Sequence, residues 1–233
     1  MEPDLASVAA LIAEPNRACM LQVLLSGTPQ SGSALAEHAG ISRALASAHL
    51  KKLVAGGLVT AARDGRRQLY SLAGEQVAEA VEALTLLAPS RPVRSLRDYS
   101  TGRNMRWARM CYDHLGGTVG VAVTDGLVAN SAVTAADGGF ALGPAAADVL
   151  GPLGIDVAAL VRERRTVVRP CPDLTEGRDH VAGSLAAAVT GRLTALGWTR
   201  LREGSRIVTV TAAGHSGLRD WLGIDLTALR AAA

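Results

Sequence analysis

The chain has 233 residues, enough for about two compact domains. Hydrophobic residues make up 48% of it and charged residues 19%, which excludes a disordered chain. No apolar run reaches the ~18 residues needed to cross a bilayer, and the N-terminus is acidic where a signal peptide is basic. We therefore expect a cytoplasmic protein with no membrane partner. Its three scattered cysteines are too few for a disulfide scaffold.

The formal net charge is only +3, but the basic residues are unevenly distributed. Residues 42–70 hold one acidic residue, Asp64, against six basic ones, whereas residues 1–90 as a whole are nearly neutral. A local basic surface on a neutral domain predicts a polyanion bound at that surface. The six basic residues are Arg43, Lys51, Lys52, Arg63, Arg66 and Arg67.

Residues 1–90 predict a helical domain with one hairpin. Asp4 is placed to cap a first helix, and the break at 14–16 precedes a second. A short helix over 33–38 is followed by a turn at Gly40 and by a longer helix that Ser42 caps and that runs to about residue 55. This order predicts a helix-turn-helix.

A hairpin and one more helix complete this domain. Asp64-Gly65 lies between two strand-like runs, which is a strong signal for a hairpin. A helix over 74–87 follows, and we place the domain boundary at residue 90.

Residues 91–233 contain an internal repeat. At an offset of 66, residues 113–133 match residues 179–199 at 8 of 21 positions, and the match resumes at 153–160 with 222–229. The copies, about 105–165 and 166–233, each predict the order cap, helix, hairpin, helix, with Asp113 and Asp179 as the caps. The predicted fold is mainly α with small β wings (α+β), a winged helix-turn-helix domain followed by two winged-helix-like pseudo-repeats that pack about a pseudo-twofold axis.

Three segments together resemble the winged-helix domain of ArsR-type bacterial repressors: LAEHAGIS at 35–42, SAHLKKL at 47–53 and GRRQLYSL at 65–72. The resemblance covers about the first ninety residues. It implies a homodimer bound to palindromic, double-stranded operator DNA.

By that resemblance, one set of side chains faces the DNA, although any single member can instead be an ordinary solvated residue. His49 is the least certain, since it can either donate a hydrogen bond to a phosphate or pack against the rest of the domain and fix the position of the helix. The predicted DNA-binding residues are Ser42, Arg43, Ser47, Ala48, His49 and Lys51 on the helix and Arg63, Arg66 and Arg67 on the wing.

The metal sites typical of many ArsR proteins are missing from the sequence. The helix before the turn has no cysteine pair, and the helix over 74–87 has no histidine. We therefore assign no metal ligand and no cofactor, and expect any small-molecule effector to bind in the C-terminal region. That region also resembles a less characterised group of longer ArsR-like regulators, from which no ligand can be carried over.

Cys111 and Cys171 each precede an Asp-His pair. If the repeat axis brings them together with His114 and His180, the four can form a redox pair, trap an electrophile or hold a soft metal. Inert packing is the alternative, as is an apolar cavity with aromatic walls. The residues assigned to effector sensing are Trp107, Cys111, Tyr112, His114, Cys171, His180 and Trp198.

The sequence contains no convincing enzyme motif, so we predict no catalytic residues and no enzymatic activity. The predicted function is a DNA-binding transcriptional regulator, a repressor that leaves its operator when the C-terminal domain senses a small-molecule or thiol-reactive signal. The alternative is that the C-terminal domain is an enzyme or a ligand-sequestering module and that the N-terminal domain only dimerises.

Overall fold

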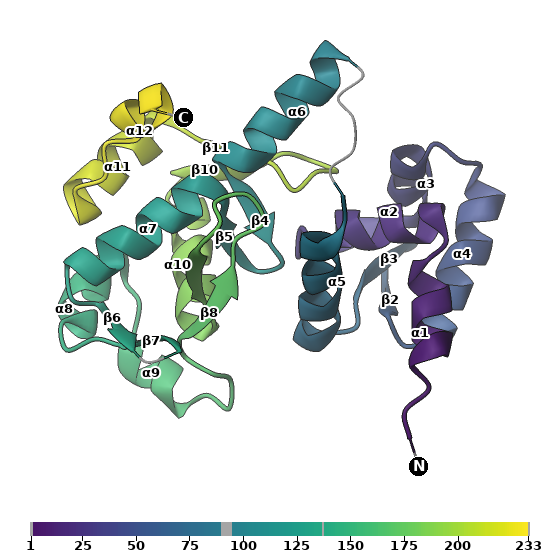
Figure 1. Cartoon of the computed structure of the whole chain (residues 1–233), viewed down its shortest axis with the longest axis horizontal. Helices are drawn as coiled ribbons and strands as arrows, with labels where there is room; N and C mark the ends of the chain where they lie inside the picture. Colours follow the sequence, from purple (N-terminus) through teal and green to yellow (C-terminus); the bar gives the residue numbers. More distant parts are fainter. Residues whose placement is uncertain (1, 90–94, 137, 233) are drawn as a thin grey trace. The chain divides into compact units, whose positions relative to one another are not determined.

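The computed structural model describes residues 2–89, 95–136 and 138–232 (Figure 1). The chain divides into two compact units, one of Met1–Ser90 with Glu203–Arg206 and one of Arg91–Arg202 with Ile207–Ala233. The boundary predicted at residue 90 lies outside the described residues. Each unit has its own hydrophobic core.

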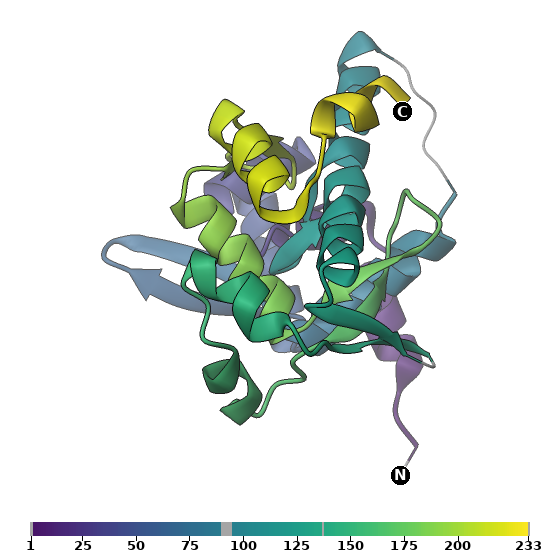
Figure 2. The same cartoon turned by 90° about the vertical axis from the view of Figure 1, so that its left-hand side faces the viewer.

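The first unit contains the helix-turn-helix and the hairpin that the sequence predicts. Its sheet has the strand order β1-β3-β2, and β1 is a strand that the sequence analysis missed. Figure 2 shows β2 and β3 as a long hairpin. The elements are α1 (Leu5–Ile12), α2 (Pro15–Leu24), β1 (Gln30–Ser31), α3 (Gly32–Ala39), α4 (Arg43–Ala55), β2 (Val59–Asp64), β3 (Arg67–Leu72) and α5 (Glu75–Leu87).

Local signals explain why these helices begin and end where they do. The Asp4 side chain accepts a hydrogen bond from the backbone N–H of Ser7 at 3.1 Å, and the Ser42 hydroxyl accepts one from that of Leu45 at 3.2 Å. Gly40 ends α3 in the left-handed conformation, with φ 65°, which turns the chain sharply into α4. The predicted caps and turn are confirmed.

The second unit is built from small hairpins and helices. Its elements are α6 (Leu96–Trp107), β4 (Arg109–Cys111), β5 (His114–Gly116), α7 (Gly117–Ala129), β6 (Val133–Ala136), β7 (Gly139–Leu142), α8 (Ala146–Leu150), the 3-10 helix η1 (Gly151–Leu153), α9 (Val157–Arg162), β8 (Arg169–Pro172), β9 (Asp179–Ala182), α10 (Ser184–Ala195), β10 (Thr199–Leu201), β11 (Val208–Val210), α11 (Ala212–Leu222) and α12 (Leu226–Ala232). With the first unit, this confirms a mainly α fold with small β wings.

From β4 onward the order is hairpin, helix, hairpin and short helices, and from β8 onward the same order occurs again. Helix α10 packs against β5, and α7 packs against β9, so each long helix contacts the other segment's hairpin. The winged-helix character of the two copies remains a prediction.

The predicted role of Asp113 and Asp179 as helix caps is wrong. Asp113 lies in the turn between β4 and β5, and Asp179 is the first residue of β9. The helices begin later, at Gly117 and Ser184. In the first copy, a turn at Gly117 separates the hairpin from the helix, and this residue has a φ of 80°, which favours glycine. A side chain would also not fit there, because a Cβ would lie 2.4 Å from the carbonyl oxygen of Arg106.

The core of the second unit surrounds α7, a helix with buried residues along most of its length. The buried side chains of this core include Val119 and Leu127 of α7, Leu150 of α8, and Leu185 and Leu193 of α10. Across the described ranges, the helices all fall short of the length and apolarity that a membrane span requires.

Candidate functional site

Helix α4 has an exposed side opposite a buried one. Ala46, Leu50 and Leu53 are buried against the rest of the first unit. The opposite positions are therefore open to solvent, and the exposed residues predicted to bind DNA are Ser42, Arg43, Ser47, Ala48 and Lys51.

His49 differs from the other predicted DNA-binding residues because it is only partly exposed. Its Nδ1 lies 3.4 Å from a carboxylate oxygen of Glu14, and the backbone N–H of Arg17 donates to the same oxygen at 2.8 Å as part of the N-terminal cap of α2. The structure thus places His49 between two helices, which favours the helix-fixing role over contact with a phosphate.

The wing carries the other basic residues. Arg63, Arg66 and Arg67 are all exposed, and the strand register pairs Asp64 with Arg67 on either side of the turn at Gly65. Because the wing and α4 follow each other in the same unit, the exposed cations lie on one small domain.

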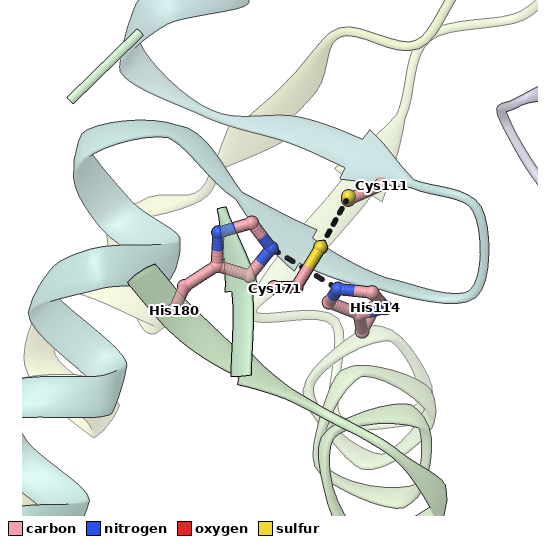
Figure 3. Close-up of side chains that lie close together, drawn as sticks. All are labelled: Cys111, His114, Cys171 and His180. Carbon is pink, nitrogen blue, oxygen red and sulfur yellow. Dashed lines mark hydrogen bonds between the residues drawn. The ribbon is translucent and has the colours of Figure 1, made fainter. Parts of the chain in front are cut away.

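The second unit brings four predicted effector-sensing residues together (Figure 3). In the β4–β5 hairpin, Cys111 lies directly opposite His114, and in the β8–β9 hairpin, Cys171 lies directly opposite His180. Directly opposed residues point to the same face of a hairpin. Cys111 and His114 are three residues apart and Cys171 and His180 nine, but the two pairs are equivalent because only the loop lengths differ.

The four side chains face one another in the interior. The Sγ atoms of Cys111 and Cys171 are 3.6 Å apart, and the Nε2 atoms of His114 and His180 are 3.0 Å apart. All four ligand atoms lie within 4.8 Å of one another, and all four residues are buried. We call these four residues the Cys-His cluster.

A carboxylate accompanies each histidine on its far side. His114 Nδ1 lies 3.1 Å from Asp113 Oδ1, and His180 Nδ1 lies 3.0 Å from Asp173 Oδ2. Asp173 is itself held by Arg109 at 2.9 Å and by the backbone N–H of Gly117 at 2.7 Å.

The cluster shifts the proton affinities of its members. A hydrogen bond with Cys111 lowers the pKa of Cys171, and the two histidines add to this against the effect of burial. Burial alone would raise the pKa of Asp173, but its contacts with His180 and Arg109 hold that pKa well below its usual range. Burial alone would lower the pKa of His180, but its contacts with Asp173 and Cys171 raise that pKa to about 9. The hydrogen bond with Cys111 and the neighbouring histidines therefore favour a Cys171 thiolate.

The remaining predicted effector residues lie in different surroundings. Trp107 is buried, with the Arg230 guanidinium 5.0 Å from its ring centre. The cavity that Trp107 lines has about 70 Å³, too small for a ligand of the size that apolar pockets usually hold. Tyr112 occupies the β4–β5 turn with φ 61°, and Trp198 packs closely beside Gly217 of α11.

Sequence reasoning missed the residues that support the cluster. Asp173 and Arg109 form a buried ion pair, and the hydroxyls of Thr124 and Thr190 accept hydrogen bonds from the hairpins. The one available signal was the acidic loop between Cys171 and His180, which contains Asp173. The repeat alignment gives Asp173 no counterpart in the first copy.

A helix-turn-helix with a basic hairpin defines a winged-helix DNA-binding protein, and comparison with known proteins agrees. Residues 12–61 match the family described as "Helix-turn-helix domain". The chain is 30% identical over 226 residues to the "Uncharacterized HTH-type transcriptional regulator YdfF" of Bacillus subtilis, covering 97% of this chain and 100% of that protein. It therefore belongs to the HTH-type transcriptional regulators, and its helix-turn-helix is of ArsR type.

Two further similarities are shorter. The chain is 42% identical over 77 residues to the "Probable mercury resistance operon repressor" of Streptomyces lividans, covering 33% of this chain and 61% of that one. A solved homodimeric winged helix-turn-helix domain from Mycobacterium bovis, described as a possible ArsR-family regulator, is 36% identical and covers 36% of this chain and 76% of that one, with a TM-score of 0.34.

Proposed function

We propose that this regulator is a homodimeric repressor of palindromic operator DNA and that a chemical signal received at the Cys-His cluster releases it. The observation that carries the DNA-binding part is the exposure of the basic side chains of α4 and of the wing. Arg43, Lys51, Arg66 and Arg67 all reach solvent there, as phosphate and base contacts require.

Exposed apolar side chains support the homodimer. Leu84, Leu86 and Leu87 of α5 are 48%, 42% and 83% exposed, and Leu5 of α1 is 78% exposed. A cluster of leucines on one helix is costly in water and is typical of an interaction surface. We propose that a second copy of the chain covers these leucines. The two α4 helices of such a dimer then bind half-sites about 10 bp apart.

The Cys-His cluster is the proposed receiver of the signal. A thiol with a lowered pKa beside a second thiol reacts with oxidants, electrophiles and soft metals, and one relative is named as a probable mercury resistance repressor. The described residues give no support to an enzymatic or ligand-sequestering role for the second unit. A repressor of this kind acts in the cytoplasm, where operator DNA lies.

The test is a footprint and gel-shift series on the DNA upstream of the protein's own gene. Changing Arg66 and Arg67 together to Ala should weaken binding to every duplex and reduce the dependence of the binding constant on salt, because phosphate contacts are lost. The control is Arg200→Ala, which removes an exposed arginine from the second unit. Equal binding by both variants and the parent would rule out the proposed interface.

A further inference from the structure

We propose that Cys111, His114, Cys171 and His180 form a closed, tetrahedral binding site for one Zn²⁺-type divalent ion, which ties the β4–β5 hairpin to the β8–β9 hairpin. The proposal concerns the metal alone. It does not depend on whether the protein is a repressor.

The spacing of the four ligand atoms fits such an ion. Zinc bonds of about 2.3 Å to sulfur and about 2.0–2.1 Å to nitrogen place the sulfurs of a tetrahedral site about 3.8 Å apart and its nitrogens about 3.3 Å apart. The two sulfurs here are 3.6 Å apart and the two Nε2 atoms 3.0 Å apart. Two cysteines and two histidines, whose ligand atoms here all lie within 4.8 Å of one another, are also the ligand set of structural zinc sites.

The surroundings of the histidine rings also suit an ion. Each Nδ1 lies close to a carboxylate oxygen, of Asp113 at 3.1 Å for His114 and of Asp173 at 3.0 Å for His180. When a metal binds, each histidine keeps the proton on Nδ1, beside its carboxylate, and gives up the one on Nε2. The two Nε2 atoms lie 3.0 Å apart in the interior, so one cation can bind both. A carboxylate behind a histidine is the usual arrangement around a bound metal.

The charge of the cluster also suits a divalent cation. Both thiol groups are buried, and a single ion balances two thiolates while the histidines stay neutral. A neutral centre avoids the large cost of burying an uncompensated charge. Because all four ligands come from the protein, the ion has no open position, which is the property of a structural or sensory site and not of a catalytic one.

The experiment uses the full-length protein, reduced, stripped with a chelator and shown by circular dichroism to be folded. Titration with Co²⁺ should saturate at one ion per chain, with the strong visible bands of tetrahedral Co²⁺ and a near-ultraviolet thiolate charge-transfer band. Zn²⁺ should then displace the Co²⁺. A folded, reduced parent protein that binds no stoichiometric Co²⁺, or that gives weak octahedral bands without charge transfer, overturns the proposal.

Three variants locate the ion. Cys111→Ser should bind Co²⁺ more than 100-fold more weakly and lose charge-transfer intensity, whereas Cys19→Ser, the matched control, should behave as the parent. Cys19 belongs to the first unit, where its sulfur lies 3.7 Å from the carbonyl oxygen of His38. Asp113→Asn, which changes a positioning residue, should weaken binding by about 10–100-fold with the band shape unchanged. Full binding by Cys111→Ser would disprove the site, and the parent titration decides the matter if that variant does not fold.

Discussion

Arg109 and Asp173 form an ion pair in the interior of the second unit, with an N–O distance of 2.9 Å and side chains that are only 1% and 0% exposed. The pair joins the start of β4 to the loop that follows β8. Because Asp173 also contacts His180, this ion pair fixes the position of one hairpin's histidine from the other hairpin.

Removing one partner of this pair should be strongly destabilising. Asp173→Ala should lower the free energy of unfolding by about 3–5 kcal/mol, because it leaves the Arg109 guanidinium buried without its counter-charge. Urea denaturation measures the change. The control is Arg178→Ala, which breaks an exposed pair with Asp125 and should cost about 0–1 kcal/mol. Equal costs for the two variants would contradict the structural role of the buried pair.

The β4–β5 and β8–β9 hairpins are held by reciprocal hydrogen bonds. The N–H of Leu115 donates to Thr190 Oγ1 at 3.0 Å, and the N–H of Val181 donates to Thr124 Oγ1 at 2.9 Å. Each of these residues is 66 positions from its counterpart in the other bond. The same offset relates His114 to His180.

Thr124→Val and Thr190→Val should therefore cost similar amounts of stability. Each leaves a buried backbone N–H without an acceptor while keeping the side-chain shape, so we expect a loss of about 1–3 kcal/mol per variant. Thermal or urea unfolding gives the values. Thr209→Val, at an exposed position on β11, should change stability by less than about 0.5 kcal/mol. A loss confined to one of the two buried threonines would show that the bonds are not equivalent.

The base preference of the regulator should depend on the start of α4. Arg43→Ala removes an exposed cation at the N-terminus of the helix expected in the major groove, and should reduce specific binding by about 1–3 kcal/mol while relaxing the preference at one base pair. Selection of binding sites from a randomised duplex pool measures this directly. A uniform loss on all sequences would instead mean that Arg43 contacts only phosphate.

The leucines of α5 should control assembly. Leu87→Glu should raise the dimer dissociation constant about 30-fold or more, corresponding to ~2 kcal/mol, because a charge replaces an apolar contact at the proposed interface. Sedimentation equilibrium measures the constant. Leu196→Glu provides the control, since Leu196 is an exposed leucine of the second unit. If Leu87→Glu leaves the molecular mass unchanged at all concentrations, a different surface must dimerise.

The sequence by itself determined the helices and the hairpin of the first unit, because their signals act over a few residues, whereas β1 depends on its pairing with β3. Ser42 caps α4 by accepting a hydrogen bond from the N–H three residues further on, and Gly40 makes the turn before it. Asp64-Gly65 closes a hairpin between neighbouring strands. The resemblance to ArsR repressors rests on the same short segments. These local interactions need no knowledge of the rest of the chain.

Only the tertiary structure decided the arrangement of the second unit. The repeat suggests that Cys111 and Cys171 meet, but the same pattern predicts helix caps at Asp113 and Asp179, since an aspartate before an apolar run suits either a cap or a hairpin. Strand register placed each cysteine opposite its histidine, and packing of α7 and α10 on the opposite hairpins joined the pairs. Contacts between residues 60 and 66 positions apart depend on long-range packing, which a local pattern does not encode.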